Sequence, residues 1–224
     1  MQELGEPIKL YKSSFDNDSK AYDLLPPTVY DLSASILPAT KAAYNIIDRE
    51  YLFTGSMTLP IGVDANHLRG SYLTRDIMTG FNYLLFSIIG EPISSTSLAT
   101  VYLAQCNERV TIQKKSTGPN KYGDIVETWV DYVTVDSYFG ETLRSRKETQ
   151  DGSFDDSIYS IIIPAKHMVS ADMQILKTSF INGKVGLSVY SVESIDTSLI
   201  DINSDTGEIY GVLHCQLKKD SAVA

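Results

Sequence analysis

The second half of this sequence repeats, in the same order, short motifs that occur in its first half. Residues 8–12 (Ile-Lys-Leu-Tyr-Lys) align with residues 110–114 (Val-Thr-Ile-Gln-Lys) at a shift of 102 positions. Three more blocks follow at shifts of 100, 106 and 109 positions, marked by the pairs Tyr22 and Tyr122, Val63 and Val169, and Cys106 and Cys215. Chance similarity between β-rich segments is the competing explanation. The order of the blocks is preserved, and the shift changes only by a few residues, as expected if loops gained or lost residues. Both observations favour a duplicated unit.

The length of the chain agrees with two units. Its 224 residues allow one large domain or two of about 100–110 residues, each of common domain size. The repeat places the boundary near Asn107 with almost no linker. We therefore expect a domain over residues 1–108 and a second domain over residues 109–224.

The hydrophobic pattern predicts strands rather than helices in both halves. In the second half, short alternating or apolar runs are separated by turn-forming residues, and we expect strands at 110–113, 124–135, 158–163, 173–176, 185–195 and 208–217. The Ser-Thr-Gly-Pro-Asn stretch at 116–120 is expected to be a loop. Residues 218–224 are expected to form a disordered tail or a docking extension. This spacing is typical of a small antiparallel barrel or sandwich.

The first half follows the same plan. Its candidate strands are residues 8–11, 29–35, 51–58, 71–74, 81–89 and 98–106, and residues 39–50 are expected to form one short helix. The predicted fold is therefore mainly all-β, with two tandem small antiparallel β-barrels or sandwiches.

Charge and composition exclude several classes of function. The net charge of −9 argues against tight, sequence-reading contact with nucleic acid, which needs a Lys/Arg footprint. It is compatible with a surface past which DNA slides. The first residues lack a basic segment followed by an apolar run, and the longest apolar stretch is too short to span a membrane. We expect a soluble chain made in the cytosol.

The residues that could carry chemistry do not form a catalytic pattern. The Asp-Thr-Ser of 196–198 and the Asp-Thr-Gly of 205–207 look like aspartic-protease loops, but both lie in the second half, so turns are the better interpretation. The 201–207 segment fails the spacing of a calcium loop. The three histidines, His67, His167 and His214, do not cluster in the sequence. No catalytic, cofactor or metal site is predicted.

The two cysteines, Cys106 and Cys215, are too few for a disulfide framework. If the repeat is real, they occupy matching strand ends in separate domains. We expect both to be reduced and to act as small buried hydrophobic residues.

The second half resembles the head–tail joining proteins of tailed phages, also called head-closure or stopper proteins. The resemblance covers roughly residues 109–224 and rests on the order of several weak motifs. These are the opening Arg-Val-Thr-Ile-Gln-Lys at 109–114, the Tyr-Gly turn at 122–123, the Val-Glu-Thr-Trp-Val-Asp strand at 126–131, the Tyr-Ser-Ile-Ile-Ile strand at 159–163, residues 186–191 and the terminal Leu-His-Cys at 213–215. The first half joins the resemblance only through the internal repeat.

The resemblance implies a non-enzymatic virion protein of the phage neck. Such proteins are small β-barrels that form a ring beneath the portal and its adaptor, continue the DNA channel, retain packaged DNA and offer a lower face to the tail. The expected partners are therefore the portal or adaptor ring, tail-terminator or other tail proteins, further copies of this chain in a ring of 6 or 12, and double-stranded DNA that is not read. Assembly is expected in the host cytoplasm, with no membrane partner and no cofactor. Two similar domains would let six copies present twelve surfaces to a twelvefold partner.

The resemblance also points to one loop. The longest polar segment, 140–157, lies between the second and third strands of the matching barrel, where the family projects a loop into the channel. The candidate channel or gating residues are Glu141, Thr142, Leu143, Arg144, Ser145, Arg146, Lys147, Glu148, Thr149, Gln150, Asp151, Gly152, Ser153, Phe154, Asp155 and Asp156. A solvated surface loop without a gate function is the alternative.

Two other functions remain open at this stage. A tail-terminator, tail-completion or baseplate ring protein would use similar small β folds, and contact with the tail tube rather than the portal adaptor would distinguish it. A tandem carbohydrate- or receptor-binding β module would suit the 14 tyrosines, and glycan binding by the isolated chain would favour it. An aspartic-protease-like enzyme ranks last.

Overall fold

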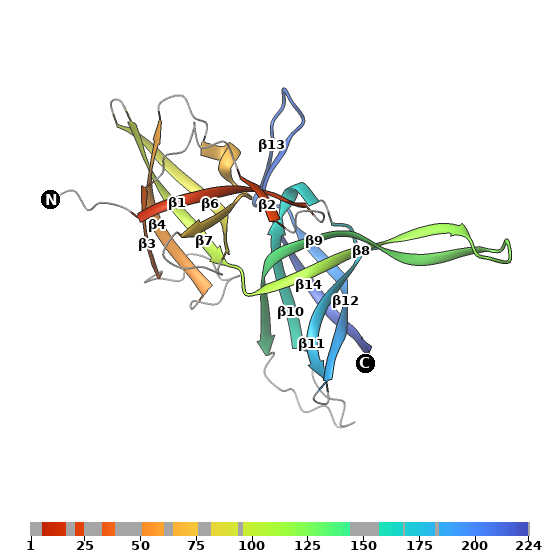
Figure 1. Ribbon diagram of the computed structural model, residues 1–224. Coiled ribbons are helices and arrows are strands. Elements are labelled where there is room, and N and C mark those ends of the chain that lie inside the picture. The colour runs from red at the N-terminus through yellow and green to blue at the C-terminus, as the bar shows by residue number, and fades with distance from the viewer. Residues whose placement is uncertain are drawn as a thin grey trace.

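A computed structural model gives the architecture for residues 6–16, 21–24, 33–38, 51–60, 65–75, 82–93, 96–143, 157–167, 169–181 and 184–223. Over these residues the protein is mainly β, with two antiparallel sheets placed side by side (Figure 1). The predicted fold class is therefore confirmed. The expected helix at 39–50 lies outside the described residues.

The first sheet closes on itself. Its strands are β1 (Glu6–Asp16), β2 (Ala21–Leu24), β3 (Ser33–Pro38), β4 (Leu52–Pro60), β5 (Tyr72–Arg75), β6 (Asn82–Ile93) and β7 (Thr96–Gln105). They pair in the order β2-β1-β3-β4-β7-β6-β5, and an added pairing of β1 with β5 completes the ring. A short 3-10 helix, η2 (Ala65–Leu68), precedes β5.

The second sheet is also ring-like. Its strands are β8 (Glu108–Pro119), β9 (Ile125–Leu143), β10 (Ser157–Pro164), β11 (Gln174–Ile181), β12 (Lys184–Asp196), β13 (Ile200–Ile202) and β14 (Ile209–Val223). Their order is β10-β9-β8-β11-β12-β14-β13, and β10 also pairs with β14. A 3-10 helix, η3 (Ala165–His167), lies between β10 and β11.

The two rings have the same connectivity. In the first, the cycle is β1-β3-β4-β7-β6-β5, and in the second it is β8-β9-β10-β14-β12-β11, so strands at equal positions along the chain have equal neighbours. The register agrees as well, because Ile8 pairs with Arg75 as Val110 pairs with Lys177, both displaced by 102 positions. This agreement supports the duplication hypothesis and the shift of its first block.

Alternation along the strands builds a separate core inside each sheet, since successive side chains point to opposite faces. The first core includes Met57, Leu73, Leu85 and Leu103, and the second includes Ile112, Val135, Ile161, Ile163 and Ile175, all fully buried. A third cluster forms where the sheets meet, with Leu52, Tyr72, Leu84, Phe86, Ala104, Cys106, Tyr138, Ile162 and Val212. The outward faces of the two sheets thus share one apolar junction.

Two local predictions for the second half are wrong. The stretch 116–120 is not a loop: β8 continues to Pro119, and the turn comes after it. Glycine and proline are tolerated there because that part of β8 pairs on one side only. Residues 218–223 are not a loose tail but the last residues of β14, and Lys218 and Lys219 pair with Ser191 and Tyr190 of β12.

Candidate interaction surfaces

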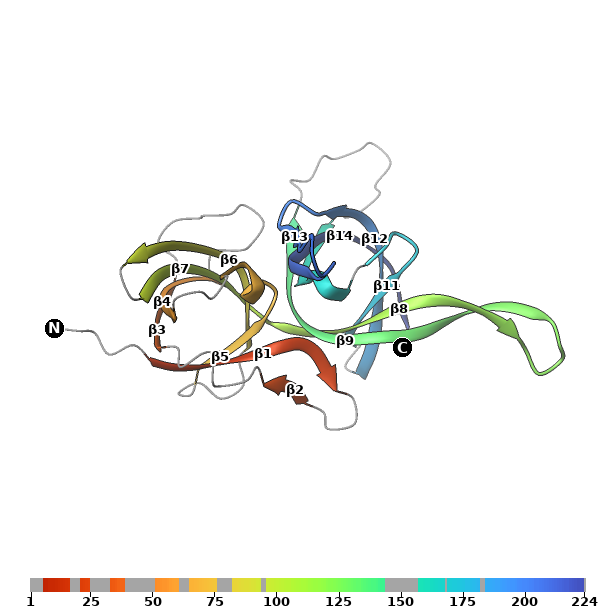
Figure 2. The same ribbon diagram turned by 90° about the horizontal axis from the view of Figure 1, so that it is seen from above.

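A long hairpin projects from the second sheet. We define the arm as residues 114–132, the distal parts of β8 and β9 with the turn between them. Figures 1 and 2 both show it extending away from the two sheets. Pairing of β8 with β11 ends at Gln113, and pairing of β9 with β10 begins at Tyr138. Among the described strands, the arm's two strands therefore pair only with each other.

The turn of the arm is formed by local hydrogen bonds around Asn120. Its side-chain Oδ1 accepts from the backbone N–H of Tyr122 at 2.8 Å and of Asp124 at 3.0 Å, and its own N–H donates to the Asp124 carbonyl. Gly123 takes a φ of 90°, a conformation that favours glycine. The Tyr-Gly turn expected at 122–123 is therefore present, and it closes a longer hairpin than the sequence indicated.

Apolar side chains stand in solvent along the arm. Tyr122 and Ile125 are both 77% exposed, and Trp129, Val130 and Tyr132 are also exposed. Lysines lie over three of these rings: Lys114 over Tyr132 (4.9 Å to the ring centroid), Lys115 over Trp129 (5.6 Å) and Lys121 over Tyr122 (4.9 Å). Such cation–π contacts are worth about 0.5–1 kcal/mol each at exposed sites. They stiffen the arm while leaving its surface accessible.

The arm was not predicted from the sequence. The β run expected at 124–135 forms the outer part of β9, but its mixture of apolar and polar residues does not show where the neighbouring strands stop. Turn-forming residues at 116–120 masked the matching extension of β8.

The predicted channel loop begins where β9 ends. Glu141, Thr142 and Leu143 are the last residues of β9, and residues 144–156 lie outside the described ones. Leu143 pairs with Ser157, the first residue of β10, so the two ends of the loop are held side by side. The loop and the arm thus belong to opposite ends of the single 19-residue strand β9.

A polar cluster centred on Asp136 joins the two sheets. Its carboxylate accepts from Arg109 Nε at 2.7 Å, from Arg109 Nη2 at 3.2 Å and from Asn82 Nδ2 at 2.5 Å, and its carbonyl accepts from the Tyr72 hydroxyl at 2.5 Å. Asn82 and Tyr72 belong to the first sheet. Asp136 is buried, and burying a charge is favourable only when it is paired and hydrogen-bonded. This cluster fixes the two sheets against one another.

A second contact between the sheets is made by close backbone approach. Gly211 of β14 donates its N–H to the Arg69 carbonyl at 3.0 Å, and a Cβ on Gly70 would lie 2.3 Å from the Gly211 carbonyl oxygen. The Arg69 guanidinium bonds to the Asp201 carboxylate and to the Leu199 carbonyl. Glycines with positive φ, Gly70 and Gly211, are needed here because no side chain fits between the two backbone segments.

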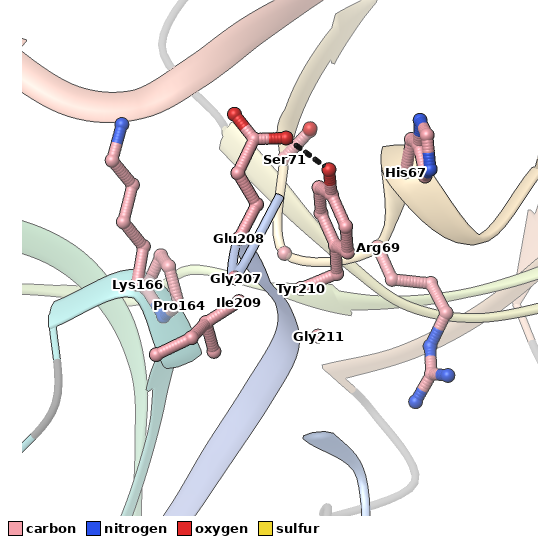
Figure 3. Close-up of a pocket in the computed structure, with 11 residues that line it drawn as sticks. His67, Arg69, Ser71, Pro164, Lys166, Gly207, Glu208, Ile209, Tyr210 and Gly211 are labelled. Carbon is pink, nitrogen blue, oxygen red and sulfur yellow. Dashed lines mark hydrogen bonds between the residues drawn. The ribbon is translucent and has the colours of Figure 1, made fainter. Parts of the chain in front are cut away.

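A cavity of about 400 Å³ lies beside this contact (Figure 3). Its lining includes His67, Arg69 and Ser71 from the first half and Lys166, Glu208 and Tyr210 from the second. The His67 ring stacks on Tyr210 at 4.7 Å, and the Tyr210 hydroxyl donates to Glu208. Figure 3 shows Arg69 and Lys166 extending to opposite sides. The charged groups therefore do not converge on one point, as a ligand site would require.

The aspartates and histidines raised by the sequence make local contacts in the second sheet. Asp196 Oδ1 accepts from the Ser198 N–H at 2.9 Å, and this bond lowers the pKa of its carboxyl. Asp205 belongs to the turn between β13 and β14, where Asn203 Oδ1 accepts from the Asp205 N–H. Burial lowers the pKa of His214, and the nearby Asp196 raises it in part. His167 is buried in η3.

The two cysteines are free and buried, but they are not equivalent. Cys106 follows β7 and packs in the junction between the sheets, whereas Cys215 lies inside β14 in the second core. The predicted match of strand ends is therefore wrong. Burial raises the pKa of Cys215 to about 12 and also raises the pKa of Cys106, where the Asp136 charge adds to the shift. Both stay as neutral thiols at neutral pH.

The described residues contain neither a candidate metal site nor a membrane-spanning helix. Within these residues, no group of three or more His, Cys, Asp or Glu side chains is placed to hold a metal ion. None of the helices in the described ranges is long and apolar enough to cross a membrane.

Comparison with known proteins identifies the second sheet. No curated protein matches the chain. The family model of the phage head completion proteins matches residues 103–209, from β7 through β13 to the first residue of β14. This range contains the whole arm and both ends of the predicted channel loop, and it confirms the resemblance that the sequence indicated. Residues 103–209 of the chain, most of the second sheet, are therefore similar to the phage head completion proteins, a family of structural virion proteins.

Proposed function

We propose that this protein is a non-enzymatic ring component of the phage neck that closes the filled head. In this role it continues the DNA channel below the portal or its adaptor, retains packaged DNA and docks the tail. The observation that carries the proposal is the match of the second sheet to the phage head completion proteins. That family accounts for a structural role in head closure, and the ring, the channel and the tail contact are the parts proposed here.

The equal connectivity of the two sheets supports a symmetry-matching role. If each chain carries two copies of one barrel, six chains present twelve related surfaces to a twelvefold partner and keep sixfold symmetry towards a tail. The Asp136 cluster and the glycine contact hold the two sheets of a chain together, so both copies would move as one body in the ring.

The position of the loop at 141–156 supports its assignment to the channel. Its two ends are paired at Leu143 and Ser157, so a segment of thirteen residues can project from one place without disturbing the sheet. The segment mixes basic and acidic side chains. Contacts among neighbouring loops, or between loops and DNA, would then weaken as salt rises. The net charge of −9 suits a wall that does not hold the DNA.

Replacement of the loop tests the gate. Residues 144–156 are exchanged for a Gly/Ser segment of equal length in the full chain, and particles assembled with the variant are assayed for retained DNA. We expect the variant to enter particles in normal amounts while packaged DNA leaks. The control is a loop of the same composition in scrambled order. It separates the effect of the loop's charge and size on DNA retention from the effect of its exact sequence. Full DNA retention by the Gly/Ser variant would contradict the gate function.

Mass measurement of the ring tests the symmetry proposal. Isolated necks, or rings assembled from the purified chain, are measured by native mass spectrometry. We expect six copies of the 24.8 kDa chain. A plain twelve-copy ring would contradict symmetry matching by duplication, while leaving head closure intact.

A further inference from the structure

We infer that the arm binds the β13–β14 hairpin of a second copy of this chain. The inference rests on the proposed ring and gives it a specific contact between neighbours. Here the β13–β14 hairpin means residues 196–209, from the end of β12 to the start of β14. Both elements project from the second sheet, and they point in different directions (Figure 1). A head-to-tail contact between two different surfaces of one chain is the kind that generates rings.

The first argument is the unsupported state of the arm. A two-stranded hairpin alone is marginally stable in water, and this one keeps Trp129, Ile125 and Tyr122 in solvent. Antiparallel partners share a face, so Trp129 and Lys115 lie together on one face and Val130 and Lys114 on the other. Both faces therefore carry an apolar group beside a lysine. Exposed aromatic side chains such as Trp129 and Tyr122 are of the kind that is enriched where a surface becomes buried against a partner.

The second argument is charge complementarity within the chain. From Lys114 to Lys121, the β8 side and tip of the arm contain three lysines and no acidic residue. From Asp196 to Glu208, the β13–β14 hairpin contains four acidic residues and no Lys, Arg or His. The acidic residues on the β9 side of the arm already have partners there: Glu127 with Lys115, Asp131 with Gln113 and Asp124 with Asn120. Lys115 is the partner of Glu127, so Lys114 and Lys121 are the lysines of the arm that no ion pair among the described residues uses and that are left for an outside partner.

The third argument is that the acidic hairpin also offers an apolar contact. Ile202 is 67% exposed at the end of β13, next to the exposed Asp205 and Glu208. The segment 114–119 extends about 20 Å at the usual rise of a strand. It can therefore contact both the apolar end and the acidic turn of that hairpin. Lys166, Lys218 and Lys219 are exposed elsewhere but have no accompanying row of aromatic rings.

Charge reversal tests the contact. The arm variant carries K114E, K115E and K121E, and the hairpin variant carries D205K and E208K. Asp201 is left intact because it binds Arg69. Self-association is measured by mass photometry and by incorporation into particles. We expect each variant alone to lose at least tenfold in association. The matched control, K218E with K219E, reverses two exposed lysines of β14 and should assemble like the wild type.

Mixing the two variants provides the decisive readout. In an equimolar mixture, the reversed arm of one variant meets the reversed hairpin of the other, and the native arm meets the native hairpin. We expect alternating assemblies to form, which also proves that both variants are folded.

Assembly of each variant alone at the wild-type level would overturn this contact and leave the ring standing. Failure of the mixture would also overturn it. A wild-type chain that stays monomeric both in solution and on particles would overturn the ring and the contact together. Loss of incorporation into particles without loss of self-association would assign the arm to a different virion protein and overturn the inference.

Discussion

The two sheets of this protein share one pattern of strand pairing but differ in what projects from them. In the second sheet, β8 and β9 stay paired from Glu108 with Ser137 out to Pro119 with Ile125 and form the arm. In the first sheet, the equivalent β1 pairs with β3 over only Glu6 and Pro7, and its distal part pairs with the four-residue β2. Among the described residues, two sheets of equal connectivity therefore carry a long projection in one case and a short strand pair in the other.

The difference shows which part of the fold is constrained. Inside each ring, every strand has two neighbours and a buried face, so its length and register are set by packing. Beyond the ring, the length of a strand pair is limited only by the hydrogen bonds between its two strands and by its solubility. Extension of the arm therefore leaves the shared cycle of strands intact.

The largest expected effect is common to both sheets. Leu103→Ala in the first core and Ile163→Ala in the second remove fully buried side chains, and each should lower the free energy of unfolding by about 2–5 kcal/mol. Urea denaturation of both variants measures this loss of free energy of unfolding. If the sheets are fixed by their junction, both variants should lower one shared transition. A separate early transition in only one variant would show that the sheets unfold independently.

A smaller effect is expected from two glycines with the same backbone but different surroundings. Gly211 has a φ of 97°, and a Cβ there would lie 2.1 Å from the Leu199 carbonyl oxygen, whereas Gly123 has a φ of 90° with open space around it. Gly211→Ala should cost about 3 kcal/mol and Gly123→Ala about 1 kcal/mol. Thermal unfolding of both variants compares them. Equal losses would show that the junction yields easily to a methyl group.

The polar junction should respond to removal of its carboxylate. Asp136→Ala leaves Arg109 and Asn82 without that partner and should lower stability by about 2 kcal/mol, less than for a fully buried pair because Arg109 is half exposed. Scanning calorimetry should show the single transition broaden or split in two. Asp124→Ala, at the tip of the arm, is the control and should leave the profile unchanged.

The pH dependence of the second sheet should carry a contribution from His214. Burial lowers its pKa in the folded chain below the usual 6.5, so the unfolded chain binds a proton first as pH falls. Stability should therefore drop below about pH 6.5, by less than about 1 kcal/mol because the ring is only half-buried. His214→Gln should flatten the dependence between pH 7 and 5.5. Asp196→Asn removes the charge that opposes the shift, and a flatter profile in that variant would contradict the account.

The smallest effect on folding is expected in the arm. Trp129→Ala removes a side chain that is 40% exposed and a contact with Lys115, so its cost to stability should stay under about 1 kcal/mol. Chemical denaturation measures it. A loss comparable to that of Leu103→Ala would mean that the arm belongs to the folded core of its own chain.

Much of the fold could be predicted from local pattern. The strands at 51–58, 158–163 and 185–195 were found because alternation and apolar runs report burial directly. The stop at Pro164 was predicted for the same reason, since proline ends the run. Prediction failed at 116–120 because turn residues there lie in a strand with one neighbour, where they cause little harm. The predicted equivalence of Cys106 and Cys215 failed because the two cysteines occupy different positions in their strands. Cys106 packs in the junction between the sheets and Cys215 in the second core.

The candidate surfaces divide in the same way. The channel role of the loop at 141–156 stays a prediction from its length, its polarity and the family resemblance, and the structure shows the pairing of Leu143 with Ser157 at its ends. The arm could not be selected, because exposure depends on where neighbouring strands stop. The pairings of β8 with β11 and of β9 with β10 set that point.

The sequence by itself determined the class of the fold and the order of most strands, because these follow from side-chain periodicity along the chain, and its ordered motifs carried the resemblance of the second half to a known family. Only the tertiary structure decided which strands close each ring, that both rings close alike, and that Asp136, Arg109 and Asn82 meet between them. Those contacts join residues far apart in the sequence. Local pattern carries no record of them, since pairing and burial depend on the whole arrangement of the chain.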